Sequence, residues 1–170
     1  MRSLNKMFLF SVGVVSLTFT GVAHGDYLYK TLDVPNASET CALGIDGKNI
    51  VGWYKDASGY HGFLYNGSTY TTFNVPGATN TNTKAYGISG NNIVGTYQDA
   101  SLKDHGFLYN GSSYTTFNLP GAKDTWPSGI SGNNIAGWYT DANGHYHGFI
   151  AIPSIQTYIP KLQVTPKLPK

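Results

Sequence analysis

The chain has 170 residues and a formal net charge of +2, with 11 Lys and Arg residues against 9 Asp and Glu residues. Five of the cations lie near the two ends, so the body between them is slightly acidic and gives no electrostatic reason to bind nucleic acid. Abundant glycine and tyrosine, with Glu39 as the only glutamate, argue against a helical fold, and the single Cys41 excludes an internal disulfide bond.

The first 25 residues have the pattern of a cleavable export signal. Arg2 and Lys6 precede an apolar run over residues 7–20, and small residues follow it at positions 21–25. The run is shorter than the ~20 residues that a membrane-spanning helix needs. We therefore expect residues 1–25 to be a signal peptide and the protein to be secreted, extracellular or periplasmic, with no membrane span after cleavage.

An internal repeat dominates the remaining chain. Residues 61–78 read HGFLYNGSTYTTFNVPGA and residues 105–122 read HGFLYNGSSYTTFNLPGA, and a third copy begins at His147. A Gly-Ile block and an Ile-Val/Ala-Gly-x-Tyr block precede each copy. We expect residues 26–152 to form one all-β domain of three repeat units, at about residues 36–78, 79–122 and 123–152.

Turn signals divide each unit into four short strands of an antiparallel meander. Asn66–Gly67 and Asn110–Gly111 suit the tight hairpin between the third and fourth strands, because both residue types adopt positive φ. Pro76–Gly77 ends a fourth strand. In such a meander the tight turns lie at one end, and the connections that vary in length lie at the other. Recognition is expected at this variable loop end.

These blocks resemble the extracellular HAF repeats of bacterial secreted and surface proteins. The matching residues are Gly87–Ile88, Ile93–Tyr97 and His105–Tyr109, with Gly106 where the family's name implies alanine. The resemblance covers about residues 27–152. It implies β-propeller-like blades without a general catalytic activity.

Three units are fewer than the four or more blades of most propellers. The chain can dimerise into a six-bladed ring, close as a three-fold β-trefoil, or be a shortened form of a longer array. We expect a strand at residues 27–35 to close the third unit, whose own fourth strand at residues 155–159 is degraded. Residues 153–170 are expected to form a flexible tail rich in proline and lysine.

Aromatic residues supply the candidate ligand site. Trp126 stands beside charged residues in an expected loop, where it would offer a stacking surface. Trp53 and Trp138 occupy equivalent strand positions; packing explains them best, but on an open face they would resemble the repeated sugar platforms of a lectin. With two tyrosines of the variable loop end, the candidate ligand-binding residues are Trp126, Tyr60, Tyr146, Trp53 and Trp138.

Repeated polar residues point to structure rather than to chemistry. The equivalent histidines are His61, His105 and His147. They would bind zinc only if they converged, and a role in the packing or turn of each unit explains them better. The equivalent aspartates are Asp56, Asp99 and Asp141. They are too few for a calcium loop and suit turns in which Asp accepts hydrogen bonds from its own backbone. We expect no metal, no cofactor and no catalytic residue.

The sequence thus predicts a secreted, non-catalytic binding or surface-interaction module. Its expected partner is a glycan or a surface protein. One alternative is a structural component of the extracellular matrix without a small ligand. A weaker alternative is a polysaccharide hydrolase that uses the three equivalent aspartates.

Overall fold

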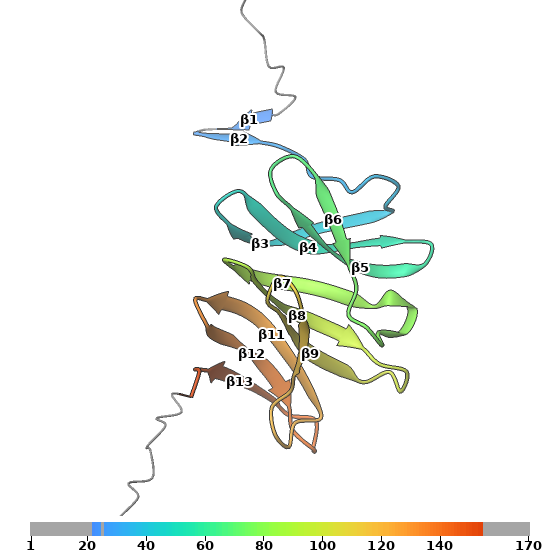
Figure 1. Cartoon of the computed structure of the whole chain (residues 1–170), viewed down its shortest axis with the longest axis vertical. Coiled ribbons are helices and arrows are strands. Elements are labelled where there is room, and N and C mark those ends of the chain that lie inside the picture. Colours follow the sequence, from blue (N-terminus) through green and yellow to red (C-terminus); the bar gives the residue numbers. More distant parts are fainter. Residues whose placement is uncertain (1–21, 25, 155–170) are drawn as a thin grey trace, which may run out of the picture. The chain divides into compact units, whose positions relative to one another are not determined.

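The computed structural model describes residues 22–24 and 26–154, and it shows an all-β protein (Figure 1). The chain divides into two units, residues 1–32 and residues 33–170. The only helical element in the described part is a single 3-10 turn, η1 (Thr79–Thr81). No helix among these residues is long and apolar enough to cross a bilayer.

The first unit contains one short hairpin. Strand β1 (Val22–His24) pairs antiparallel with β2 (Tyr27–Tyr29), with His24 opposite Tyr27. Apart from β1, the predicted signal peptide lies outside the described residues, as does the predicted tail from residue 155 onward. The closure of the third repeat by residues 27–35 stays a prediction.

The second unit contains three separate antiparallel sheets, one for each repeat. The first sheet consists of β3 (Glu39–Asp46), β4 (Asn49–Asp56), β5 (Gly59–Tyr65) and β6 (Tyr70–Phe73). The second consists of β7 (Thr83–Ser89), β8 (Asn92–Gln98), β9 (Asp104–Tyr109) and β10 (Tyr114–Phe117). The third consists of β11 (Asp124–Ser131), β12 (Asn134–Thr140) and β13 (Tyr146–Ala151).

Each sheet is a simple meander, because every strand pairs with its neighbour in sequence. The predicted four strands are therefore confirmed for the first two repeats, and three of the four are present in the described part of the third. The hairpins need their glycines: Gly67 and Gly111 have φ values of 97° and 94°, where a side chain would be strained. Asn66 fixes its turn by accepting hydrogen bonds from the backbone N–H groups of Ser68 and Thr69.

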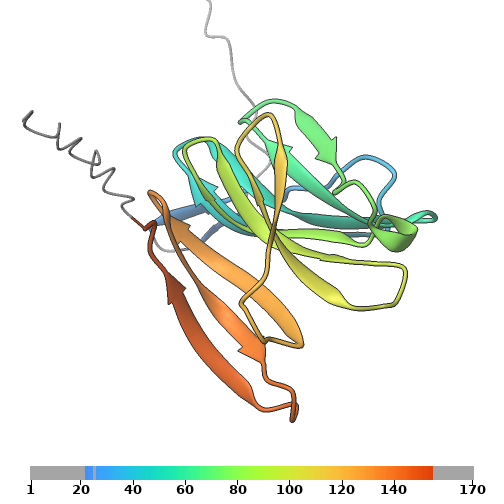
Figure 2. The same cartoon turned by 60° about the horizontal axis from the view of Figure 1, so that its bottom comes forward.

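The three sheets of the second unit stack one on the next (Figures 1 and 2). Val51 and Leu64 of the first sheet pack in one hydrophobic cluster with Ala85, Ile88 and Ile93 of the second sheet. We call the side of a sheet that packs on the following sheet its front face, and the opposite side its back face. The core of this unit therefore lies between sheets, where Val51 and Phe107 have no exposed surface.

The same stacking recurs at the second junction. Phe73 of the first sheet lies edge-on to Phe107 of the second, with ring centroids 6.4 Å apart. Phe117, the equivalent of Phe73, lies 6.0 Å from Phe149 of the third sheet. The front faces of the first and second sheets thus each place a phenylalanine against the back face of the following sheet.

A repeated hydrogen bond joins the end of one repeat to the first strand of the next. The threonine hydroxyls of Thr83 and Thr125 accept from the backbone N–H groups of Val75 and Leu119, at 3.1 and 3.2 Å. Thr40 accepts in the same way from Val34 at 3.1 Å. This bond sets where each sheet begins relative to the loop before it.

Candidate functional site

The variable loop end collects the connections between the second and third strands and those between sheets. The second-to-third-strand connections are residues 57–58, 99–103 and 141–145, and the connections between sheets are residues 74–82 and 118–123. The tight turns lie at the opposite end, since the strands alternate in direction. The predicted division into a constant and a variable end is therefore confirmed.

Three of the candidate aromatic residues meet on the third sheet. Trp126 and Trp138 are directly opposite each other on β11 and β12, and their rings stack at 3.8 Å with an interplanar angle of 15°. Tyr146 lies 5.2 Å from Trp138 and is 73% exposed. The expectation that Trp126 lies in a loop is wrong: it belongs to β11. We call Trp126, Trp138 and Tyr146 the third-sheet aromatic set.

The other two candidates meet at the equivalent place on the first sheet. Trp53 and Tyr60 make an edge-to-face contact at 5.3 Å. The ammonium group of Lys84, from the second sheet, lies 4.0 Å from the ring centre of Tyr60 and 5.2 Å from that of Trp53. Lys55 approaches the Tyr60 ring at 5.3 Å, and the proximity of the Tyr60 phenol raises the pKa of Lys55. This pair therefore has two lysine ammonium groups near its rings, an arrangement that the described residues do not repeat at the third-sheet set.

The second sheet has polar residues at these positions. The register places Lys84 and Thr96 where the third sheet has Trp126 and Trp138. Asp104 precedes its histidine as Tyr60 and Tyr146 precede theirs. Burial raises the pKa of Asp104, and the nearby Asp124 carboxylate adds to the effect. The variable loop end thus differs chemically from sheet to sheet. Aligning the repeats strand by strand would have revealed Lys84 as a candidate beside the aromatic residues.

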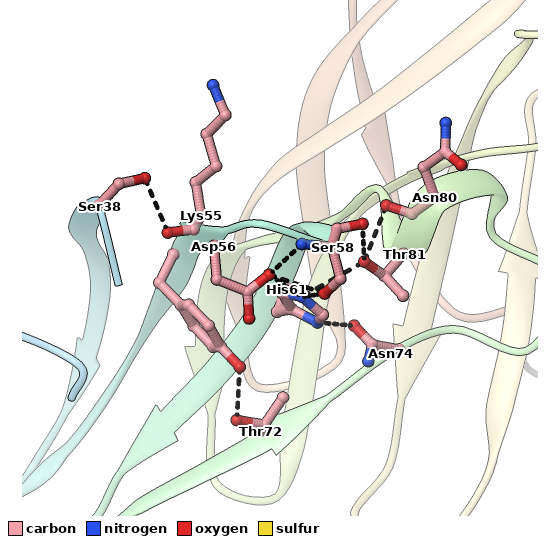
Figure 3. A network of polar contacts seen from close by, with 10 residues as sticks. Ser38, Lys55, Asp56, Ser58, His61, Thr72, Asn74, Asn80 and Thr81 are labelled. Carbon is pink, nitrogen blue, oxygen red and sulfur yellow. Dashed lines mark hydrogen bonds and ion pairs between the residues drawn. The ribbon is translucent and has the colours of Figure 1, made fainter. Parts of the chain in front are cut away.

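A second group of polar residues closes the loop after β4 (Figure 3). The Asp56 carboxylate accepts from the Ser58 backbone N–H at 2.8 Å and from the Ser58 hydroxyl at 2.7 Å. The same oxygen lies 3.1 Å from His61 Nε2, and His61 Nδ1 lies 3.1 Å from the side-chain oxygen of Asn74. His61 also stacks on Tyr54 at 4.9 Å. We call this arrangement the Asp–His clip.

The Asp–His clip recurs in the other two sheets. His105 Nε2 lies 2.8 Å from Asp99, and His147 Nε2 lies 3.5 Å from Asp141. Hydrogen bonds from Ser58, its hydroxyl first and then its backbone N–H, lower the pKa of Asp56 to about 2. The pKa of Asp99 is lowered mainly by the Ser101 hydroxyl and that of Asp141, to about 2, mainly by the backbone N–H of His145.

Each histidine therefore contacts the aspartate of its own repeat unit, consistent with the predicted role in the packing or turn of that unit. Among the described residues, no three His, Cys, Asp or Glu side chains are grouped to hold a metal ion. Ser58 Oγ does lie 2.9 Å from His61 Nε2, the contact that a serine nucleophile makes with its base. Yet the Ser58 hydroxyl donates its hydrogen bond to Asp56. The third clip has Asn143 at the position of Ser58, so the hydroxyl is not part of the repeated arrangement. The repeated geometry is that of a loop closure.

Comparison with known proteins finds no family model that matches this chain, and no significantly similar curated protein or solved structure. The resemblance to HAF repeats therefore rests on the repeated motif alone and stays a prediction.

Proposed function

We propose that this protein is a secreted, non-catalytic binding module of propeller-like sheets, which holds carbohydrate on aromatic residues at its variable loop end. The N-terminal export pattern supports the location, outside the cell or in the periplasm. The aromatic sets support the proposed binding function, and the stacking of the sheets supports the proposed propeller-like arrangement.

Separate sheets support a propeller over a trefoil. A propeller blade is a four-stranded meander that packs face to face on its neighbours. The first two sheets have this form, and each of the three described sheets of the second unit consists of strands from one repeat. A trefoil would instead need strands of different repeats to pair in a shared barrel.

The observation that carries the binding proposal is the third-sheet aromatic set. Aromatic rings bind the apolar C–H face of a sugar ring by stacking, and they lose little conformational entropy in doing so. Tyr146 is 73% exposed and lies beside the stacked pair of Trp126 and Trp138. Among the described residues no Lys or Arg lies over the rings of this set, in contrast to Tyr60 under Lys84. An uncharged polysaccharide is the ligand class that fits it best.

The test is a glycan and polysaccharide binding screen, followed by titration of the best ligand. Tyr146→Ala and Trp138→Ala should each weaken binding about tenfold or more, the range of an aromatic hot spot. Tyr27→Ala is the matched control, because Tyr27 is equally exposed at 73% but lies on β2. Equal affinities for Tyr146→Ala and Tyr27→Ala, or a folded protein that binds no glycan, would contradict the proposal.

A further inference from the structure

The two junctions between sheets share a close backbone approach at glycine. A Cβ atom on Gly44 would lie 2.9 Å from the carbonyl oxygen of Tyr86 and 3.0 Å from the Cα of Gly87. A Cβ atom on Gly87 would lie 3.2 Å from the Cα of Gly129 in the third sheet. Glycine at this position therefore lets the first strand of the next sheet come close.

Both junctions also share a hydrogen bond at the tight-turn end. The backbone N–H of Gly90 donates to Asp46 at 2.6 Å, and that of Gly132 donates to Ser89 at 2.9 Å. In each case the last residue of a first strand accepts from the turn glycine of the following sheet. The next acceptor in this series is Ser131, and the turn glycine that begins the series is Gly47.

Within the described residues of the second unit, the two outer faces of the stack lack a neighbouring sheet. No described heavy atom lies within 4 Å of a Cβ built on Gly129, the third glycine of the series. On this front face Ile150 is 66% exposed, while the equivalent Leu64 is packed against the core cluster. On the back face of the first sheet, Ile45 is 69% exposed, while the equivalent Ile88 is 7% exposed.

We propose that a second copy of this chain covers these faces head to tail. The front face of the third sheet packs on the back face of the first sheet of the second copy, and the reverse junction closes a ring of six sheets. Ile45 then lies against Ile150 as Ile88 lies against the cluster with Leu64. Gly129 receives the first strand of the other copy, and the Gly47 N–H donates to the Ser131 hydroxyl.

The difference between the two outer faces favours a second copy of the chain as the partner that covers them. They are unlike faces, so two copies cannot bury both in a single isologous contact, whereas a head-to-tail contact repeats a junction that the chain already makes twice. Six sheets lie within the usual range of propeller blades. The aromatic sets at the variable loop end remain accessible, since Trp53 and Tyr60 are only half-buried at a covered junction. The inference does not rest on the carbohydrate proposal, although Trp138 and Ile150 lie on the same face of the third sheet.

The test measures association of the purified protein, expressed from the full sequence, by sedimentation velocity over a concentration series. The unmodified protein should sediment as a dimer. Ile45→Lys and Ile150→Glu should each raise the dissociation constant at least about tenfold, because each buries a charge in both junctions. Leu102→Glu is the matched control, because Leu102 is also 69% exposed but lies in the loop after β8.

Mixing the two variants distinguishes a head-to-tail dimer from other assemblies. A mixed dimer has one unmodified junction and one junction that pairs Lys with Glu, so an equimolar mixture should regain dimer. Gly129→Ala should also abolish the dimer while leaving the circular dichroism spectrum unchanged. The proposal would be overturned if the unmodified protein were a monomer, which is the result expected if residues 155–170 cover the face. It would also be overturned if Ile45→Lys left the assembly intact or if mixing the two variants restored no dimer.

Discussion

At the residue scale, the buried threonines at the start of the second and third sheets, Thr83 and Thr125, each accept a backbone hydrogen bond. Thr83 has no exposed surface, and its hydroxyl accepts from the backbone N–H of Val75, itself 6% exposed. Without that hydroxyl the N–H group would be buried without a partner. Such a group costs the full desolvation penalty of a donor that water cannot reach.

Thr83→Val, which conserves shape, should therefore reduce the free energy of unfolding by about 1–3 kcal/mol. Chemical denaturation monitored by tyrosine and tryptophan fluorescence measures it. Thr71→Val, at an exposed position of β6, is the control and should change little. If both variants lose the same stability, the hydrogen bond does not contribute as described.

The aspartates of the Asp–His clips make stability depend on acid pH. Asp56 has its pKa lowered from 3.8 to about 2, so the folded state favours its ionised form. A carboxylate of this kind contributes stability above its unfolded pKa and loses that contribution as pH falls toward its folded pKa. Asp99 and Asp141 are shifted in the same direction.

The thermal unfolding midpoint should therefore fall as the pH decreases from about 4 to about 2. Differential scanning calorimetry at a series of pH values measures this. The triple variant Asp56→Asn, Asp99→Asn and Asp141→Asn should show a flatter pH profile in this window. A profile as steep as that of the unmodified protein would assign the acid sensitivity to other groups.

At the scale of the elements, the first strands of the second and third sheets, β7 and β11, pack against the sheet before them. The bulge of the first strand occurs at the same place in all three sheets, between Ala42 and Gly44, Ala85 and Gly87, and Pro127 and Gly129. At the glycine after the bulge, in Gly44 and Gly87, the backbone of the following sheet approaches closely. The irregularity is thus a repeated packing device, as bulges often are.

Gly44→Ala should reduce the free energy of unfolding by about 1–3 kcal/mol, because the new methyl group meets a backbone oxygen that cannot move alone. Thermal or urea unfolding compares it with Thr71→Ala, an exposed substitution on β6. A stability equal to that control would mean that the two sheets separate easily at this point.

At the scale of the whole molecule, the proposed glycan binding and the proposed assembly involve opposite ends of the sheets. Ile45 and Ile150 lie toward the tight-turn end, while Trp138 and Tyr146 lie toward the variable loop end. Loss of dimer formation with retained glycan binding would therefore separate the two proposals, as would the opposite result. A structural role in an extracellular matrix would be favoured by an assembly that binds no sugar.

The sequence by itself determined the repeats, the strands and the turns, because alternating apolar residues and Asn-Gly pairs act over short distances. It also identified the aspartates and histidines of the clips, since each pair lies within one repeat unit. Only the tertiary structure decided that the five candidate aromatic residues form two equivalent groups, and that Lys84 covers one of them. Those contacts depend on strand register and on stacking between sheets, which bring together residues far apart in the chain.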